Sequence, residues 1–410
     1  MLIGEIRSVT SSLPNRCSPW KKKNRKHVHA IRYFIMTKTG QLDKIIALLH
    51  RSSFVTKKTG PGKFSSYTFG PAGVLTFRNL SQLLWDSLVT SQIDTYPVED
   101  SVFIKDKRDE LPELRSSLTE STISHLPDIL QLVDYTLPFA IVQRGQTFPK
   151  APKHQDKFLF DSNVQTEIVL QYFCSPSSSL QSFDHWIQQR LLWWRRNAAN
   201  PSQISSSEIE TIDDETSKAY IQCQFPWGPN IVEEIISKGS NPVHKLQQTT
   251  GTRLQCKNGK KFYTPHIIEC STVLEHCLVT CLCDSYTENV VKRGDKSSVV
   301  EKFNLSPKIA PYKISVVSVS KSRYQEIQEV ASYINKDLRN SGIDVFHAKD
   351  SLSATKQFKR NDLMGIPYTA ILDEETLVSG TIDLRNKDTT LQEKIHITHL
   401  KEIILKNIQF

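Results

Sequence analysis

Strand-like and helix-like segments alternate over the last hundred residues, and this alternation constrains the fold more than any other feature of the chain. Short apolar runs predict strands over 312–319, 343–348, 368–372 and 377–384, the last interrupted by a glycine. Apolar residues recurring every three or four positions predict helices over 324–340, 352–363 and 391–408. Strands alternating with helices of this length predict an α/β domain with a mixed sheet.

The preceding region has weaker but readable patterns. Its predicted helices are 41–52, 74–89, 183–199 and 274–286, and its predicted strands are 139–142, 167–173 and 265–269. Residues 202–218 are Ser-rich and then acidic, which indicates a solvated surface loop. Residues 291–307 are charged and lack a clear period, which indicates a boundary between a domain at 41–296 and one at 309–410.

The basic character of the chain is concentrated at its beginning. The formal charge is +9, and residues 1–40 contribute +8 because nine Lys and Arg stand there against the single acid Glu5. A basic, acid-poor start that contains serines fits a mitochondrial transit peptide. A nuclear address or nucleic-acid patch at the Lys21–Lys26 cluster, or a tail without function, fits the same composition. The rest of the chain is nearly neutral, so overall charge does not predict general nucleic-acid binding.

Other residue types exclude several classes of protein. No apolar run approaches the roughly 18 residues that a membrane helix needs, so no membrane association is expected. The eight cysteines lack a disulfide-framework spacing and contain no CxxC pair, which favours core thiols in a reducing compartment over a zinc site. His396 and His399 are interpreted as exposed helix residues, and no metal or cofactor is expected. Residues 70–73, Gly-Pro-Ala-Gly, fit either a phosphate cradle or a simple turn.

The C-terminal motifs resemble those of the anticodon-binding domain of class II aminoacyl-tRNA synthetases. The similarity rests on Ala310-Pro311, on the run from Asn361 to Tyr368, and on Gly380 followed by Leu384-Arg385. The body resembles glycyl-tRNA synthetase at residues 67–73, at 225–228 and at 265–269. The resemblance implies a class II synthetase-like antiparallel-sheet domain followed by an anticodon-binding-like mixed-sheet domain. The protein as a whole is then expected to belong to the α/β (α+β) class.

The residues that synthetases use to hold ATP are missing. Glycyl enzymes carry Gly-Leu-Gly-Arg in the third signature motif, and here Val273, Glu275 and His276 replace both glycines and the arginine. The second motif needs an Arg-x-Glu triplet, and the corresponding residues 147–150 read Thr-Phe-Pro-Lys. Because arginines neutralise the triphosphate in the transition state, two such losses argue against catalysis.

Further motifs resemble the accessory subunit of mitochondrial DNA polymerase gamma. They include Arg-Leu-x-Trp-Trp-Arg at 190–195 and Asp-Ser-Tyr-Thr-Glu-Asn at 284–289. The resemblance implies a non-catalytic protein of the mitochondrial matrix nucleoid that binds the catalytic subunit and tightens its hold on primer-template or double-stranded DNA, independently of sequence. An active glycyl-type synthetase and a tRNA-binding relic of one are the alternative hypotheses.

The resemblance also suggests candidate site residues. The polymerase-interface candidates are Gly380, Thr381, Asp383, Leu384, Arg385, Lys387, Asp388, Thr389, Thr390 and His396. The DNA-contact candidates are Arg190, Arg195, Arg196, Lys257, Lys260 and Lys261. The tryptophans beside these arginines fit either an aromatic–basic surface or core packing, and core packing is favoured because Trp mostly fills cores.

The segment before residue 130 bears on oligomeric state. Vertebrate members of the resembled family form a homodimer through an inserted helix–loop–helix. Only residues between Pro97 and Leu130 are available here, and Pro112 and Pro127 interrupt them, so two long helices do not fit. A monomer that forms a one-to-one heterodimer with the polymerase is expected.

Overall fold

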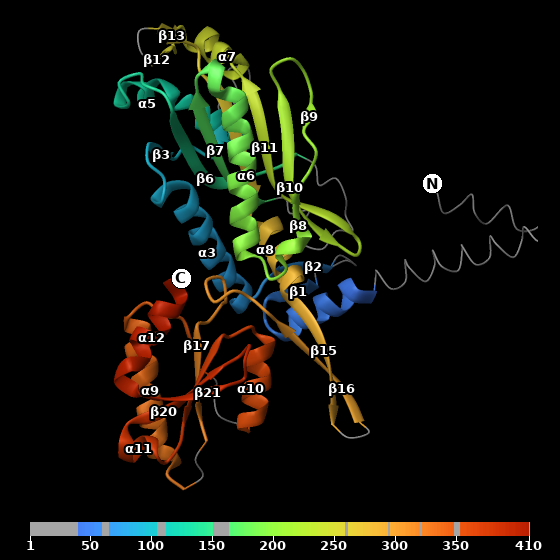
Figure 1. Ribbon diagram of the computed structural model, residues 1–410, viewed down its shortest axis with the longest axis vertical. Coiled ribbons are helices and arrows are strands. Elements are labelled where there is room, and N and C mark those ends of the chain that lie inside the picture. Colours follow the sequence, from blue (N-terminus) through green and yellow to red (C-terminus); the bar gives the residue numbers. More distant parts are fainter. Residues whose placement is uncertain are drawn as a thin grey trace, which may run out of the picture. The chain divides into compact units, whose positions relative to one another are not determined.

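The structure is a computed structural model, which describes residues 40–59, 65–104, 112–150, 164–258, 261–293, 296–319, 322–347 and 353–409. The chain divides into one unit that ends at Ala47 and a second from Leu48 to Phe410. Residues 40–51 are helical, close to the predicted 41–52. Both large sheets belong to the second unit (Figure 1).

The first of these sheets has eight strands and is mostly antiparallel. Its order is β3-β6-β7-β14-β11-β10-β8, and β9 pairs with β10 beside this path. The strands are β3 (Thr95–Val98), β6 (Phe139–Thr147), β7 (Gln165–Cys174), β8 (Ile204–Ser206), β9 (Glu210–Thr211), β10 (Ser217–Phe225), β11 (Gly228–Gly239) and β14 (His266–Val273). Only β3 and β6 run parallel within it. The predicted antiparallel-sheet domain is confirmed.

Helix α6 (Ser179–Asn197) covers one face of this sheet (Figure 1). The predicted helix 183–199 is therefore confirmed, with an earlier start. Trp186 packs edge-on against Tyr172 of β7, with 5.6 Å between ring centroids. The side chains of Phe183, Ile187 and Trp194 are also buried, so the packing interpretation of the aromatic residues holds for this side of the helix.

Three further helices of this region are shorter than α6. They are α3 (Pro71–Trp85), which continues as a π-helical turn to Thr90, α7 (Asn241–Thr250) and α8 (Leu274–Ser285). At the start of α3, a Cβ atom on Gly70 would collide with the backbone carbonyl of Ser53, and one on Gly73 with that of Phe54. These two glycines therefore permit close packing of the chain, which is the turn interpretation of the Gly-Pro-Ala-Gly run.

Two segments form strands where the local composition did not indicate them. Residues 202–218 are not one solvated loop, because β8 and β9 form there and pair with β10. The aperiodic 291–307 segment is largely the second strand of a hairpin, β15 (Tyr286–Arg293) and β16 (Lys296–Phe303). The predicted loop at 202–218 was wrong because strand pairing compensates for locally polar composition, whereas the hairpin does not test the predicted domain boundary.

The C-terminal sheet has the order β18-β17-β19-β20-β21. Its strands are β17 (Ile314–Ser318), β18 (Val345–Phe346), β19 (Tyr368–Leu372), β20 (Thr381–Asn386) and β21 (Gln392–His396). Strand β17 runs parallel to β18 and β19, whereas β20 runs antiparallel to β19 and to β21. The predicted mixed sheet is confirmed.

The helices of this region are α9 (Tyr324–Asn340), α10 (Ala354–Leu363), α11 (Thr376–Ser379) and α12 (Ile397–Gln409). Helix α9 matches its prediction to the residue. The predicted strand 377–384 is instead the short helix α11 followed by β20, and the predicted helix 391–408 begins with strand β21. His396 therefore ends a strand and does not share a helix with His399.

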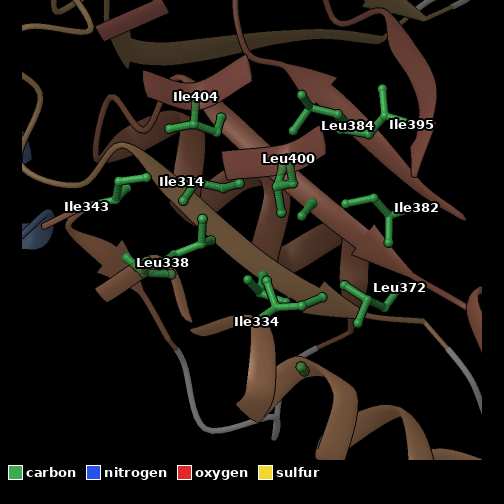
Figure 2. Packing of buried hydrophobic residues seen from close by; sticks show 14 of the residues in the cluster. Ile314, Ile334, Leu338, Ile343, Leu372, Ile382, Leu384, Ile395, Leu400 and Ile404 are labelled. Carbon is green, nitrogen blue, oxygen red and sulfur yellow. The ribbon is translucent and has the colours of Figure 1, made fainter. Parts of the chain in front are cut away.

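An aliphatic core joins α9 and α12 to this sheet. Ile314 of β17, Leu338 of α9, Ile382 of β20 and Leu400 of α12 are all at most 2% exposed (Figure 2). At roughly 25 cal/mol per Å² of buried apolar surface, a core of this kind supplies most of the driving force for folding of the region.

Candidate functional site

One face of the large sheet carries buried polar side chains. Glu167 and Gln171 are four residues apart on β7, so their side chains lie on the same face of the strand. Glu269 on β14 lies directly opposite Gln171. Side chains two residues apart on a strand share a face, so Val273, one of the positions tied to ATP, belongs to the same face. Helix α6 packs on the opposite face, against Tyr172.

The carboxylates on this polar face are compensated by hydrogen-bond donors from neighbouring residues. The carboxylate of Glu269 accepts hydrogen bonds from Thr119 Oγ1 at 2.8 Å, Lys238 Nζ at 2.7 Å and Gln171 Nε2 at 2.8 Å. Glu167 accepts from the Leu118 backbone N–H at 2.9 Å. Burial raises the pKa of Glu167 above that of an ordinary carboxyl group, and the bond from Leu118 opposes the shift.

A pocket of about 510 Å³ opens beside this network, between the sheet, α7 and the short helix α4 (Thr119–Ser124). Its two lysines are paired, Lys238 with Glu269 and Lys245 with Glu120. No lining residue among those described is an arginine. A triphosphate would meet no unpaired cation on these walls, which matters because its charge must be neutralised.

The three degenerate ATP-motif positions lie where β14 passes into α8. Val273 ends the strand, and Glu275 and His276 are in the first turn of the helix. The Glu275 carboxylate accepts the Thr166 backbone N–H through both oxygens, at 3.0 and 2.9 Å. Burial raises the pKa of Glu275. This carboxylate therefore holds the beginning of β7, and it would repel a phosphate group.

Arg190 is not a surface residue, which corrects its assignment as a DNA-contact candidate. Its side chain is 3% exposed, and its Nε lies 2.7 Å from Glu233 Oε1 on β11. Trp194 Nε1 donates to the other oxygen of Glu233 at 2.6 Å. The Glu233 carboxylate compensates the buried charge and Nη1 donates to Ser87 Oγ at 3.3 Å, whereas Nη2 has no partner among the described residues. The guanidinium of Arg190 therefore has a structural role.

The remaining DNA-contact candidates fall into two separate groups. Arg195 and Arg196 are exposed at the C-terminal end of α6. Lys257 and Lys261 are exposed on the hairpin of β12 (Cys256–Asn258) and β13 (Lys261–Tyr263), and Lys260 lies outside the described residues. The hairpin leads into β14, whose first residue pairs with Cys174 shortly before α6 begins. The two groups thus lie towards opposite ends of a helix that spans about 28 Å at 1.5 Å per residue.

The β12–β13 hairpin has two further features that sequence reasoning missed. Phe262 is 58% exposed, and the guanidinium carbon of Arg253 lies 5.9 Å from the centre of its ring. Basic residues together with an exposed aromatic ring are typical of nucleic-acid-binding surfaces. The signal was available in the local run of basic residues around Phe262, but only the structure reveals that the ring is exposed.

The polymerase-interface candidates divide between buried and exposed positions. Leu384, Arg385 and Lys387 are at most 9% exposed, so their side chains do not form a docking surface, which corrects these three assignments. Arg385 makes a two-bond contact with Asp362, at 2.8 and 3.0 Å. The exposed candidates are Asp388, Thr389, Thr390 and His396, and Gly380, Thr381 and Asp383 are half-buried.

Gly380 has a clear local role. It ends α11 with φ of +69°, a left-handed conformation that disfavours any residue with a Cβ atom. A Cβ atom here would also lie 2.6 Å from His396 Nε2. A substitution of Gly380 therefore perturbs the sheet directly, and a change in partner binding would not by itself reveal an interface.

Two exposed apolar side chains flank the β20–β21 hairpin. Val378 on α11 is 83% exposed, and Leu391 just before β21 is 71% exposed. They lie near opposite ends of the hairpin, since β20 begins at Thr381 and the turn closes at Leu391. Apolar residues exposed to this degree beside polar candidates are a feature of protein-binding surfaces. Sequence reasoning assigned both residues to regular elements and missed their exposure.

Comparison with known proteins finds similarity over most of the chain. The chain is 27% identical over 380 residues to mitochondrial DNA polymerase subunit gamma-2 of Xenopus laevis, covering 83% of this chain and 81% of that protein. It is also 27% identical to the Mus musculus DNA polymerase subunit gamma-2, over 82% of this chain and 83% of that protein. The chain resembles DNA polymerase subunit gamma-2 along most of its length.

Synthetase similarity is present as well. Glycine–tRNA ligase of Chlorobaculum tepidum is 25% identical over 295 residues, which cover 71% of this chain and 61% of the ligase. Residues 313–407 match the anticodon binding domain family. The resemblance to gamma-2 and the class II synthetase-like fold predicted from the motifs are both confirmed.

The segment in which vertebrate gamma-2 relatives were expected to carry extra helices contains only short elements in its described part. Residues 98–104 and 112–130 form β4 (Phe103–Ile104), β5 (Glu113–Leu114), α4 and most of α5 (Leu126–Leu132). Arg115 is buried here and donates to the carbonyl oxygens of Gln146 and Asp100. This segment is therefore anchored to the edge of the large sheet in the gamma-2-like chain.

The described residues contain neither a reactive-cysteine site nor a metal site, and they contain no membrane-spanning helix. Six of the seven described cysteines are buried, and all seven are free thiols. Burial raises the pKa of Cys223 and Cys256 to about 12, which keeps these thiols protonated. Within the described ranges, no cluster of three or more potential metal ligands occurs. None of the helices described there is long and apolar enough to cross a membrane.

Proposed function

We propose that the chain is a non-catalytic accessory subunit of the mitochondrial DNA polymerase, which binds the catalytic subunit and increases its hold on primer-template DNA. The observation that carries this proposal is the similarity to DNA polymerase subunit gamma-2 across more than four fifths of the chain. The frog relative is named as mitochondrial, and the basic first 40 residues fit an import signal to the matrix.

The absence of catalysis in this proposal is supported by the polar face of the large sheet. Glu275 stands where phosphate would approach and is engaged with Thr166. Lys238 and Lys245, the pocket cations, are both paired. Glycine–tRNA ligase activity is the second candidate function, because the relatives include that enzyme. Measurable glycine-dependent ATP–pyrophosphate exchange by the purified chain would favour the ligase and refute the accessory role.

The proposed surface for the polymerase catalytic subunit is the β20–β21 hairpin with its flanking apolar residues. Thr389 and Thr390 at the turn, His396 at the strand end, and exposed Val378 and Leu391 lie on it. Because β21 is the edge strand of its sheet, its outer backbone groups are open to a partner strand.

A variant at Leu391 tests this surface without touching the core. We expect Leu391→Asp to weaken binding to the catalytic subunit about tenfold and to reduce processive synthesis, because apolar side chains dominate contact energy at interface centres. Leu180→Asp is the matched control, since Leu180 is 74% exposed on α6. Equal affinity of the two variants, measured by surface plasmon resonance, would remove this hairpin from the interface.

The proposed DNA-binding element is the β12–β13 hairpin. Lys257 and Lys261 would contact phosphates, which position a duplex without reading its sequence. Each phosphate contact adds about 0.9 to the slope of log affinity against log salt concentration. We therefore expect Lys257→Glu with Lys261→Glu to weaken DNA binding and to lower that slope by about 2.

The salt titration needs a control with the same change in net charge. The double variant Arg195→Glu with Arg196→Glu serves, because its residues lie towards the other end of α6. Loss of DNA affinity in this control, with full affinity in the hairpin variant, would transfer the contact to the helix end and reject the hairpin.

The proposed stoichiometry is one accessory subunit for each catalytic subunit. The described part of 98–130 supplies only short elements, in place of two long helices that could mediate a homodimer. Sedimentation equilibrium of the isolated chain should give the mass of a monomer. A stable dimer at micromolar concentration would contradict the proposed stoichiometry.

A further inference from the structure

A cavity of about 330 Å³ lies on the C-terminal domain, outside the β20–β21 hairpin. All its lining side chains can form hydrogen bonds and none is acidic: they are Ser332, Asn335, Lys336, Arg339, Asn340 and His347. A cavity lined by donors and cations, without a carboxylate, has the chemistry of an anion site.

Helix geometry explains why these residues converge. Ser332, Lys336 and Asn340 follow one another at intervals of four along α9, and Asn335 and Arg339 form the adjacent row. His347 follows strand β18 and reaches the same place, with its Nδ1 3.2 Å from Asn335 Nδ2. The cavity is thus built on a helix and a strand end, which hold its walls in fixed positions.

The cations of this cavity are available to a ligand. Lys336 is exposed, and among the described residues no hydrogen bond or ion pair to its side chain occurs. Arg339 donates one bond, from Nη2 to the Val345 carbonyl oxygen at 3.2 Å, which leaves its other N–H groups for a ligand. Asp344, three residues before His347, is paired with Arg78.

Asn335 supplies an independent observation that points to a ligand. The side chain is 6% exposed, yet its Oδ1 has no hydrogen-bond partner among the described residues. A buried acceptor without a partner costs about 1–3 kcal/mol. A hydroxyl group of a ligand in the cavity can donate to this oxygen, because a hydroxyl is a hydrogen-bond donor without a positive charge that Lys336 and Arg339 would repel.

We propose that this cavity binds a phosphate group that carries or adjoins a hydroxyl, with phosphate oxygens at Lys336 and Arg339 and the hydroxyl donating to Asn335 Oδ1. Hydrogen phosphate and a ribose phosphate both have this chemistry. The ligand can come from two sources, a free phosphate or mononucleotide, or the backbone of a nucleic acid. The site is separate from the polymerase surface and holds whether or not the proposed accessory function does.

The test uses the full chain and three probes: inorganic phosphate, adenosine monophosphate and a single-stranded RNA oligonucleotide. Isothermal titration at low salt should give saturable binding of phosphate and of the nucleotide. We expect Lys336→Gln with Arg339→Gln to weaken both about tenfold or more, since a charge-assisted hydrogen bond contributes that much. Lys356→Gln, an exposed lysine on α10, is the matched control and should bind as wild type.

An isosteric change tests whether the cavity selects an anion. Asn335→Asp keeps the shape of the side chain but places a negative charge in the cavity, so it should abolish phosphate binding while the circular dichroism spectrum is unchanged. Competition between phosphate and RNA would identify a nucleic-acid backbone as the source, and phosphate binding without competition would identify a small molecule. Absence of saturable phosphate binding, or equal binding by the double variant and Lys356→Gln, would overturn the proposal.

Discussion

The two large sheets of this chain treat polar groups in opposite ways. The eight-stranded sheet buries carboxylates and amides on one face, where Glu167, Gln171 and Glu269 are each at most 7% exposed. The C-terminal sheet buries an aliphatic core and has apolar side chains such as Val378 and Leu391 exposed at its edge. Most polar groups of the first sheet find partners within it, and only Gln171 Oε1 and Gln143 Nε2 on this face lack one among the described residues, whereas the second sheet exposes apolar side chains that a partner could cover. A protein-binding surface is therefore expected on the C-terminal domain.

Breaking a buried ion pair should give the largest difference between the two regions. We expect Glu233→Ala to reduce the free energy of unfolding by about 3–5 kcal/mol, because it leaves the Arg190 charge buried and unpaired. Urea denaturation measures this loss. Asp362→Ala in the C-terminal domain should cost only about 1 kcal/mol, since the Asp362–Arg385 pair is partly exposed. Similar losses in the two variants would contradict the comparison.

The contact between Glu275 and Thr166 should give the next largest effect. Glu275→Gly removes the acceptor of the Thr166 N–H and places glycine in a helix, so a loss of about 2–3 kcal/mol is expected. Glu275→Gln is the control, because its carbonyl oxygen can still accept this hydrogen bond. Thermal unfolding should rank wild type above Gln and Gln above Gly, and a Gly variant as stable as wild type would refute the structural role.

Gly380 allows the cost of backbone conformation to be measured in the C-terminal domain. Gly380→Ala should lose about 1–2 kcal/mol from its left-handed backbone, plus the cost of the contact with His396. Gly342→Ala is matched, with φ of +77° and no atom within 4 Å of a new Cβ atom. Calorimetry should therefore find the larger loss at Gly380, and equal losses would show that the His396 ring simply moves aside.

The polar face of the large sheet should also make the free energy of unfolding weakly dependent on pH. Because burial raises the pKa of Glu167 in the folded chain, folding favours the protonated form. The stabilisation from this group is complete below the ordinary carboxyl pKa of 4.5 and declines as pH rises towards the folded pKa. Glu167→Gln should flatten that decline, with a change within about 1 kcal/mol at pH 7. An unchanged pH profile of stability would contradict the assignment.

The sequence predicted those elements whose periodicity is set by a local core. Helix α9 was predicted to the residue because Ile327, Ile334 and Leu338 all face the sheet. Strand β21 was missed because Ile395 and Ile397 continue the apolar pattern of α12, and only pairing with β20 separates strand from helix. Arg190 was misassigned because its partner Glu233 lies 43 residues away on β11, beyond any local signal.

The tie between Glu275 and Thr166 makes the loss of a motif hard to reverse. Glycine at position 275, as in the synthetase signature, would release a backbone N–H that the present fold relies on. A chain that regained the glycine would lose stability at once, whereas ATP binding would return only after arginines were also regained. The first substitution back towards the synthetase motif therefore lowers stability before ATP binding can return. For this reason, reversion at position 275 is disfavoured in the evolution of the protein.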